Sequence, residues 1–317
     1  MFKKLFRPLI YTTIIAIITY VIIVLYGDIK NIKSSLLHFN WIYFAGALSL
    51  ALLNYILRFI RWSFYLRCIE IKIPLFESFL TFLSGFTVSI TPAKMGEVIK
   101  SLLLKKTRGI AMAKSVPIVI AERLTDMIAI LILAIAGAAT YKYGWAVIAI
   151  TSAVVIFIVL IIMFRGVGEK IIKILVKFSL FRKFEEKMKE SYESTYLMSR
   201  PERMLWSVLI SIFAWEAECL AFFLILRGAG LLHPDILQAT FIYAFSTAAG
   251  AVAMMPGGLG VTEGGLMGLT ILLGKVNKAV ASSTTILIRL ATLWFAVIVG
   301  CFALILYTKL YLKNEND

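Results

Sequence analysis

Long apolar stretches alternate with short polar ones along most of this chain. A helix that crosses a membrane needs about 17–25 mostly apolar residues. Stretches of that kind occur at six places: residues 9–26, 41–57, 116–140, 145–164, 204–226 and 284–306. The pattern predicts an all-α polytopic membrane protein with six full spans.

Two further apolar regions are interrupted in the middle. The first covers residues 76–91 and resumes over 95–104, and the second covers 236–255 and resumes over 264–273. Each second arm has about ten residues and a length of roughly 15 Å, half the hydrocarbon thickness. We therefore predict two re-entrant broken-helix hairpins. Proline and glycine mark their breaks: Pro92, Gly96, Pro256, Gly257, Gly258 and Gly260.

Composition and charge support the membrane assignment. The chain of 317 residues is 61% hydrophobic and 16% charged, with a mean hydropathy of +0.90, which excludes an ordinary soluble enzyme and a disordered chain. With the N-terminus in the cytoplasm and both hairpins re-entrant, 23 of the 33 Lys and Arg residues are cytoplasmic and six lie outside. This split predicts an N-in/C-in topology and explains the net charge of +15 without a nucleic-acid partner.

The two hairpins belong to an internal repeat. An offset of 166 residues aligns Glu97 with Glu263 and Arg123 with Arg289. Each half, residues 1–140 and 145–308, then contains two spans, a hairpin and a third span. Three crossings per half require the halves to be inverted in the membrane. Inverted repeats with broken helices are typical of transporters whose site lies near the midplane, so we expect one membrane domain, residues 1–317.

Charged residues at membrane depth usually face a cavity or a partner. The cations predicted to bind a lipid phosphate are Arg123, Arg289, Lys94 and Lys100. The acids predicted to act as counter-charges or gates are Glu97, Glu122, Asp126, Glu216, Glu218 and Glu263. The alternative is architectural: each Glu–Arg pair is a buried salt bridge that locks a hairpin to the following helix.

Two other regions carry charge. Arg58, Arg61 and Trp62 follow the second span, where we predict an interfacial anchor first and a headgroup contact second. Most of the other aromatic residues are expected to face lipid or the interface. Residues 165–203 carry ten cations and six Glu, which predicts a cytoplasmic connector on anionic headgroups or, alternatively, a dock for a partner.

Cofactor chemistry is not indicated. The only histidines, His38 and His233, and the three scattered cysteines have no metal-ligand spacing, and we expect no metal, cofactor or catalytic residue. An ATP-binding motif is also missing, so transport would be downhill or coupled to an ion.

Several motifs together resemble a known family. They are Arg58-x-x-Arg61-Trp62, Pro92-x-x-x-Gly96-Glu97, Glu122-Arg123-Leu124-x-Asp126, Pro256-Gly257-Gly258-Leu259-Gly260-x-x-Glu263, and Arg289. This set resembles the lysylphosphatidylglycerol synthase transmembrane-region family over essentially the whole chain, although family members often have Arg at the positions of Lys94 and Lys100. The resemblance implies a flippase-like domain in a bacterial or archaeal cytoplasmic membrane.

Three functions follow from the pattern and the resemblance. The first is a lipid translocase that moves a phosphate-bearing headgroup of a phospholipid, aminoacyl-phospholipid or polyprenyl-phosphate glycolipid between leaflets. The second is a membrane transferase, with Glu97, Asp126 or Glu263 as general base. The third is a scaffold for a separate lipid-modifying synthase. Because the chain ends at Asp317, we expect it to lack the soluble aminoacyl-transfer domain of the full-length resistance proteins. The expected partners are membrane lipids and a separate synthase.

Overall fold

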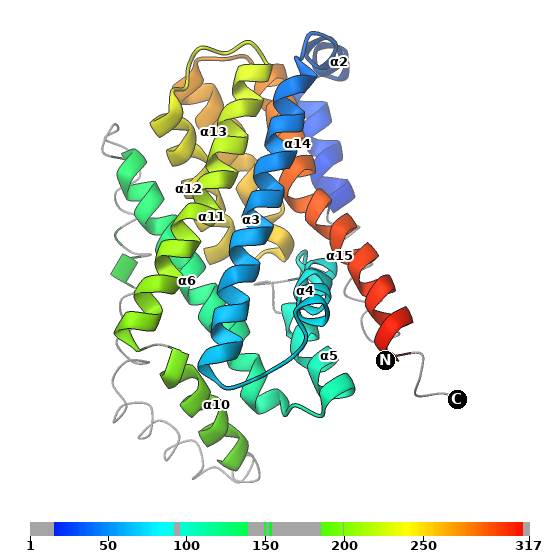
Figure 1. Ribbon diagram of the computed structural model, residues 1–317. Coiled ribbons are helices and arrows are strands. Elements are labelled where there is room, and N and C mark those ends of the chain that lie inside the picture. The colour runs from blue at the N-terminus through cyan, green and yellow to red at the C-terminus, as the bar shows by residue number, and fades with distance from the viewer. Residues whose placement is uncertain are drawn as a thin grey trace.

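The computed structural model describes residues 16–91, 96–138, 149, 152–153, 185–198 and 200–312. Within these residues the chain forms helices joined by turns, with no strand (Figure 1). The predicted all-α class is confirmed for this part of the chain. Pro92, Lys94, most of the predicted span 145–164 and residues 165–184 lie outside the described residues.

Long helices build the body of the molecule. Helices α3 (Trp41–Cys68) and α11 (Pro201–Gly228) run side by side, and α6 (Met112–Ala138) packs against both. The last helix is continuous over Lys278–Leu312, because the π-helical turn η4 (Leu290–Trp294) joins α14 (Lys278–Arg289) to α15 (Phe295–Tyr307) and η5 (Thr308–Leu312) follows.

Four described helices are long and apolar enough to cross a membrane. They are Trp41–Cys68, Pro201–Gly228, Pro256–Gly274 and Lys278–Leu312. Helix α6 has 27 residues, a comparable length, but it carries Glu122, Arg123 and Asp126 in its middle. This is the architecture of a polytopic helical membrane protein.

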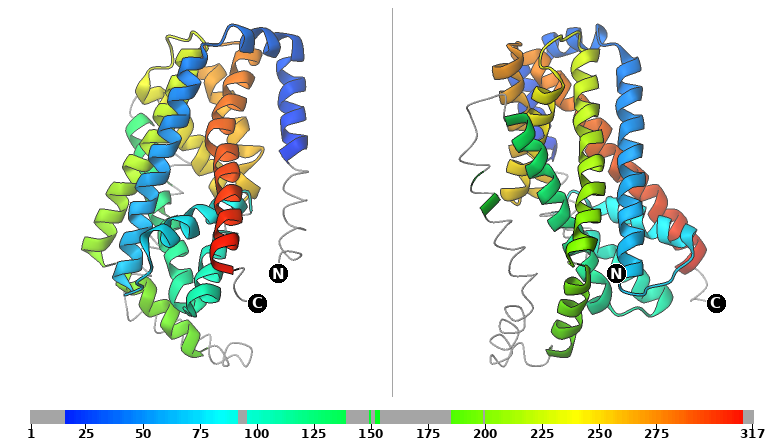
Figure 2. Two further views of the ribbon diagram at one scale, coloured as in Figure 1. Left: turned by 45° about the vertical axis from the view of Figure 1, so that its right-hand side comes forward. Right: turned by 60° about the vertical axis from the view of Figure 1, so that its left-hand side comes forward.

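Both predicted broken regions are helical hairpins in the structure. The first consists of α4 (Leu75–Ser84) with the turn η1 (Gly85–Val88), followed by α5 (Ile99–Arg108). The second consists of α12 (Ile236–Val252), the turn η3 (Pro256–Gly258) and α13 (Val261–Gly274). The two hairpins lie at opposite ends of the bundle (Figure 2). The arm α13 has 14 residues, longer than the ten expected, because it begins directly after Gly260.

The glycines explain the shape of the second break. Gly257, Gly258 and Gly260 have φ of 60°, 71° and 85°, a region that residues with a Cβ rarely adopt. The backbone N–H of Gly260 donates to the Glu263 carboxylate at 2.7 Å, so Glu263 caps the first turn of α13. This backbone geometry turns the chain sharply between α12 and α13.

A charged pair joins the start of α4 to the end of α5 in the first hairpin. Arg108, at the end of α5, donates to the fully buried Glu77 of α4 through Nε, at 3.1 Å, and through Nη2. Thr107 also donates to Glu77 and lies 2.8 Å from the Tyr307 hydroxyl of α15. The hydrogen bonds to Glu77 raise the pKa of Arg108. The pair therefore ties both arms of this hairpin to the last helix.

Helix α3 continues beyond the predicted end of its span. It reaches Cys68, and Arg58, Arg61 and Trp62 are 5%, 0% and 0% exposed. Two of the cations counted as cytoplasmic, Arg58 and Arg61, therefore lie inside the bundle. Their burial is possible because carboxylates from distant parts of the chain surround them.

Short helices cover the two ends of the bundle. The helix Ala16–Gly27 leads into the amphipathic α2 (Ile29–Leu37), which lies at the end occupied by α12 and α13. At the other end, α10 (Glu185–Met198) packs against α6. The described part of the predicted connector is thus helical.

Candidate functional site

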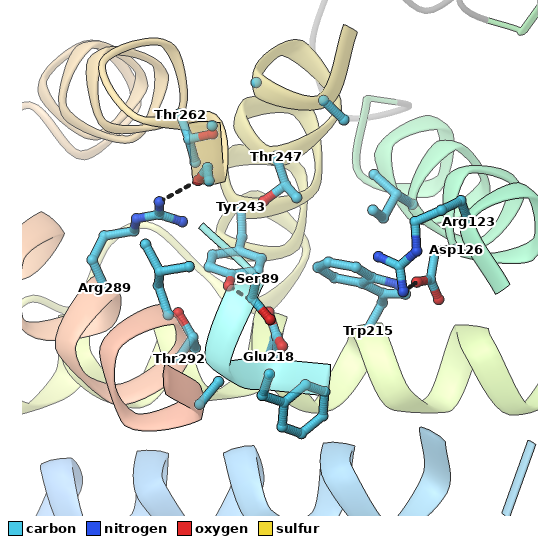
Figure 3. Close-up of a pocket in the computed structure, with 18 of the residues that line it drawn as sticks. Ser89, Arg123, Asp126, Trp215, Glu218, Tyr243, Thr247, Thr262, Arg289 and Thr292 are labelled. Carbon is cyan, nitrogen blue, oxygen red and sulfur yellow. Dashed lines mark hydrogen bonds and ion pairs between the residues drawn. The ribbon is translucent and has the colours of Figure 1, made fainter. Parts of the chain in front are cut away.

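A cavity of about 200 Å³ lies between α3, α6, α11, α12 and the last helix (Figure 3). Both hairpins contribute to its wall, through Ser89 and Thr91 of the first and Gly257 and Gly258 of the second. The ionisable residues that line it are Arg58, Arg123, Asp126, Glu218 and Arg289, together with the phenols Tyr55 and Tyr243. The cavity therefore combines a surplus of guanidinium groups with hydroxyl and aromatic groups.

Arg123 and Arg289 reach this cavity from different halves of the chain. Arg123 projects from α6 and Arg289 from the end of α14, on opposite sides of the cavity in Figure 3. Both face the same space although 166 residues separate them in the chain.

Each of these arginines is held by the glutamate predicted as its partner. Arg123 Nη2 lies 3.2 Å from a Glu97 carboxylate oxygen and 3.0 Å from Asp126. Arg289 Nε lies 2.7 Å from Glu263, and its Nη2 donates to the carbonyl of Gly257 at 2.6 Å. The side chains of Arg123 and Arg289 are 21% and 8% exposed. The pairs therefore lock each hairpin to a helix while leaving part of each guanidinium at the cavity.

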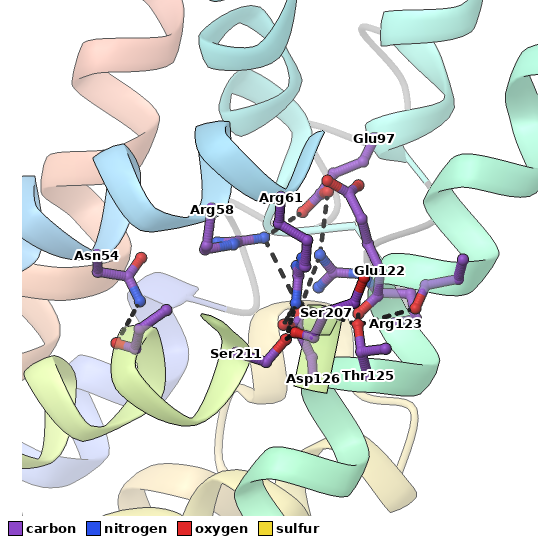
Figure 4. Close-up of polar contacts among 12 residues, drawn as sticks. Asn54, Arg58, Arg61, Glu97, Glu122, Arg123, Thr125, Asp126, Ser207 and Ser211 are labelled. Atoms are coloured by element: carbon purple, nitrogen blue, oxygen red, sulfur yellow. Dashed lines mark hydrogen bonds and ion pairs between the residues drawn. The ribbon is translucent and has the colours of Figure 1, made fainter. Parts of the chain in front are cut away.

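In the first half, the pair belongs to a larger group that we call the first-half cluster (Figure 4). Its members are Arg58, Arg61, Glu97, Lys100, Glu122, Arg123 and Asp126. Arg61 Nη1 contacts Asp126 at 2.6 Å and Thr125 at 3.2 Å, and it also donates to Ser211 of α11. The cluster thus connects α3, α5, α6 and α11.

Lys100 lies in the cluster but not at the cavity. Its Nζ is 2.5 Å from Glu122 and 3.4 Å from Glu97, and it lies 4.6 Å from the centre of the Trp62 ring. The side chain is 1% exposed. In this arrangement its charge is satisfied by protein groups, so Lys100 supports the site rather than lining it.

Arg58 differs from its neighbours in how it is bonded. Its Nη2 lies 3.6 Å from Glu97 and 3.9 Å from Asp126, and its guanidinium lies 5.2 Å from the centre of the Phe86 ring. Its buried Nε and Nη2 have no hydrogen-bond partner within the described residues. A buried guanidinium that lines a cavity with unused donors is suited to bind an anion.

Some of the predicted acidic residues line the cavity and others do not. Asp126 and Glu218 line the cavity, whereas Glu97, Glu122 and Glu263 lie behind its wall. Glu218, on α11, accepts a hydrogen bond from the Tyr243 hydroxyl at 2.6 Å. Glu216 accepts from Thr240 at 3.4 Å and does not line the cavity.

The aromatic residues of the cavity were not anticipated. Tyr55, Trp215 and Tyr243 were expected with the lipid-facing and interfacial aromatics, but they are 4%, 5% and 3% exposed and line the cavity. Glu218 was the one available signal, because a carboxylate in the middle of a span needs a nearby donor. Nothing in the sequence identified which residue supplies it.

The cavity wall brings together three arginines, Arg58, Arg123 and Arg289. Guanidinium groups can hold a phosphate through charge-assisted, bidentate hydrogen bonds. Among the described residues, no group of three His, Cys, Asp or Glu side chains could hold a metal ion.

Comparison with known proteins places the chain in a family. Residues 12–300 match the family described as "Lysylphosphatidylglycerol synthase TM region". A UPF0104 membrane protein of Pyrococcus horikoshii is 26% identical over 81% of this chain and 84% of its own length. A UPF0104 membrane protein of Methanothermobacter thermautotrophicus is 24% identical over 93% of this chain and 94% of its own length. These matches confirm the resemblance drawn from the motifs, and the chain belongs to the lysylphosphatidylglycerol synthase transmembrane-region family.

Proposed function

We propose that this protein is a lipid translocase that moves a phosphate-bearing headgroup between the two leaflets of a prokaryotic cytoplasmic membrane. The observation that carries the proposal is the shared cavity. Arg123 and Arg289, from the two halves of the chain, and Arg58, with unused donors, line one space deep in the bundle. Such an arrangement supports binding of a single anionic headgroup by both halves.

The charges explain why the ligand would be an anion. Burying a guanidinium costs several kcal/mol unless it is paired. Ion pairs with Glu97 and Glu263 offset this cost for Arg123 and Arg289. Arg58 has its carboxylate neighbour, Glu97, at the longer distance of 3.6 Å. A phosphate that enters the cavity adds charge-assisted hydrogen bonds, each contributing about 1.5–3 kcal/mol.

The hairpins suggest how access could alternate. Their opposite placement in the bundle supports an inverted repeat in which one hairpin enters from each side of the membrane. In that topology, six spans and two re-entrant hairpins would surround the cavity near the midplane. Rocking of one half against the other would open the cavity first to one leaflet and then to the other.

A reconstitution assay tests this proposal. The purified protein is placed in liposomes with a fluorescent lipid, in one arm phosphatidylglycerol and in another a polyprenyl-phosphate sugar. Loss of the outer-leaflet signal after chemical quenching then reports translocation. We expect translocation well above that of protein-free liposomes in at least one arm, and the active arm identifies the lipid class.

Substitution at the cavity connects that activity to the site. Arg123→Gln and Arg289→Gln should each lower the translocation rate about tenfold or more, because each removes a charge-assisted contact. The control Lys309→Gln changes an exposed cation at the far end of the last helix and should leave the rate unchanged. If folded variants at positions 123 and 289 translocate as fast as the control, this assignment of the site is wrong.

A further inference from the structure

Glu218 is the charged residue of the cavity that the proposed function does not use. It lies on α11 with its carboxylate in the cavity wall, and the residue is 9% exposed. Asp126, the other acid of the cavity, lies 2.6 Å from Arg61 and 3.0 Å from Arg123. Within the described residues Glu218 has no cation within ion-pair distance, and its strong hydrogen bond comes from the neutral phenol of Tyr243.

The groups that face Glu218 come from every helix packed on α11. These are Tyr55 and Arg58 of α3, Arg123 and Asp126 of α6, Tyr243 of α12, and Arg289 of α14; on α11 itself, Glu216 and Cys219 lie beside Glu218. Tyr55 is within electrostatic range of both Glu218 and Arg58, and its hydroxyl donates to the carbonyl of Thr292 at 3.4 Å. Glu218 is therefore in direct contact with one phenol, that of Tyr243, and no guanidinium of the described residues lies within ion-pair distance of it.

The charges around the cavity balance when Glu218 is ionised. Within the described part of the chain, three groups together comprise five cations and five carboxylates: the charged residues of the cavity wall, their direct ion-pair partners, and the Lys100–Glu122 pair, which contacts the partner Glu97. The cations are Arg58, Arg61, Lys100, Arg123 and Arg289, and the carboxylates are Glu97, Glu122, Asp126, Glu218 and Glu263. A monoanionic phosphate that entered this group alone would leave one net negative charge in a region of low dielectric, which is unfavourable.

We propose that Glu218 binds a proton when an anionic headgroup enters the cavity, so that translocation carries one proton with each lipid. This inference rests on the proposed function. Protonation of Glu218 removes one negative charge, and the loaded site then has the same net charge as the empty one. Glu218 is suited to this role because its ionised carboxylate is stabilised by a hydrogen bond and not by a salt bridge, so neutralising it breaks no ion pair.

The same balance could be reached with a zwitterionic headgroup, whose ammonium would pair with Glu218. The polar group on Glu218 is a phenol, however, and the guanidiniums of the cavity lie around the same space. The guanidiniums would repel the ammonium group of such a headgroup. A bound anion, in contrast, favours an uncharged carboxyl beside it.

Thermodynamic linkage between proton and lipid binding predicts how the lipid affinity changes with pH. If the protonated form binds the lipid, the lipid must in turn favour protonation by the same free energy. The affinity for an anionic lipid should then fall as pH rises, by up to about tenfold per pH unit once unliganded Glu218 is ionised. Phosphatidylglycerol is a suitable probe because its phosphodiester keeps a single charge over the neutral range.

Calorimetric titration of the full-length protein in detergent with short-chain phosphatidylglycerol tests this directly. Titrations in two buffers with different ionisation enthalpies give the number of protons taken up per lipid bound. We expect a value near one for the wild-type protein at neutral pH. Glu218→Gln, which imitates the protonated carboxyl and can still accept from Tyr243, should bind the lipid with a value near zero and with no dependence on pH.

Two further variants serve as a control and as a test of the hydrogen bond to Glu218. Glu202→Gln removes an exposed acid from the first turn of the same helix and should keep the wild-type proton count. Tyr243→Phe removes the hydrogen bond that Glu218 accepts, and the proposal expects a lower proton count than in the wild type, because this bond is the contact given to the ionised carboxylate. A wild-type count in Tyr243→Phe would contradict the role given to this hydrogen bond and with it the proposal.

The possible failures are distinguishable. Binding of phosphatidylglycerol with a proton count of zero, or an unchanged count in Glu218→Gln, overturns the inference and leaves the proposed function intact. Tighter binding of short-chain phosphatidylethanolamine than of phosphatidylglycerol, lost in Glu218→Gln, would assign Glu218 to an ammonium group and also overturn it. If the folded protein binds neither these lipids nor a polyprenyl phosphate, the proposed function fails together with the inference.

Discussion

The two hairpins carry the same Glu–Arg pair in very different surroundings. In the first half, Glu97 lies 3.2–3.6 Å from three cations, Arg58, Lys100 and Arg123. In the second half, Glu263 contacts Arg289 and the N–H of Gly260. In the described part of the chain, the first hairpin is therefore fixed by a network of charges, whereas the second is fixed by one ion pair, Arg289–Glu263, and by the hydrogen bond from Arg289 to the Gly257 carbonyl.

The glutamates should give the largest difference between the two halves. Glu97→Gln would leave several buried cations without their shared carboxylate, and we expect it to lower the free energy of unfolding by about 3–5 kcal/mol. Glu263→Gln should cost about 1–3 kcal/mol, because the amide can still accept from Gly260 and Arg289 keeps the Gly257 carbonyl.

Thermal unfolding of the purified variants in detergent measures this difference. Both transitions should be compared with that of Glu202→Gln, an exposed control. Equal losses at positions 97 and 263 would contradict the division between a network and a single pair.

Two neighbouring arginines of α3 provide the next comparison. Arg61 is fully buried and bonded to Asp126, Thr125 and Ser211, so Arg61→Gln should destabilise the protein by about 3 kcal/mol. Among the described residues, Nε and Nη2 of Arg58 have no hydrogen-bond partner, so Arg58→Gln should cost less than about 1 kcal/mol of stability.

Lipid binding should separate the same two arginines. We expect Arg58→Gln to weaken binding of short-chain phosphatidylglycerol about tenfold, because it removes a guanidinium with donors available to the phosphate. Combined thermal and binding measurements on the two variants check this. A stable Arg58→Gln protein with unchanged affinity would remove Arg58 from the site.

Packing at two glycines gives a comparison that involves no charge. A methyl group on Gly300 would lie 2.7 Å from the carbonyl carbon of Phe86 and would collide with the backbone of Thr87, so Gly300→Ala must push the first hairpin away from α15. The expected cost is about 1–3 kcal/mol. Gly268, in α13, has open space around it, and Gly268→Ala should be neutral or stabilising by up to about 1 kcal/mol.

Melting temperatures of these two alanine variants make a matched pair, since each adds one methyl group to a helix. Equal destabilisation of both would show that the close contact between α15 and the first hairpin is not maintained in solution.

Much of the site could be predicted from the sequence because its signals are local. Pro and Gly close together, as at residues 256–260, favour a break in a helix, and a charge inside an apolar stretch must face a cavity or a partner. From these rules the positions of both broken regions, and the Glu–Arg pairs at 97/123 and 263/289, could be read before the structure was known. The resemblance to the family rested on the same residues.

The remainder depends on contacts between distant segments. Arg58 and Arg61 were placed at a membrane surface because an apolar stretch ended there. Helix α3 nevertheless continues through them, because Glu97 and Asp126, from other parts of the chain, neutralise the charges of the two arginines. Tyr243 could not be assigned to Glu218 for the same reason. Hydropathy describes each segment against lipid, and it contains no information about which segments neutralise each other.

The central claim is that Arg123 and Arg289 hold one headgroup in one cavity. The most direct test is the binding isotherm of short-chain phosphatidylglycerol for the wild-type protein, Arg123→Gln and Arg289→Gln. We predict one lipid per chain in the wild type, and a weakening of that single site by roughly 10- to 100-fold in each variant, as expected for loss of a charge-assisted contact of about 1.5–3 kcal/mol. Two independent sites in the wild type, or full affinity in either folded variant, would contradict it.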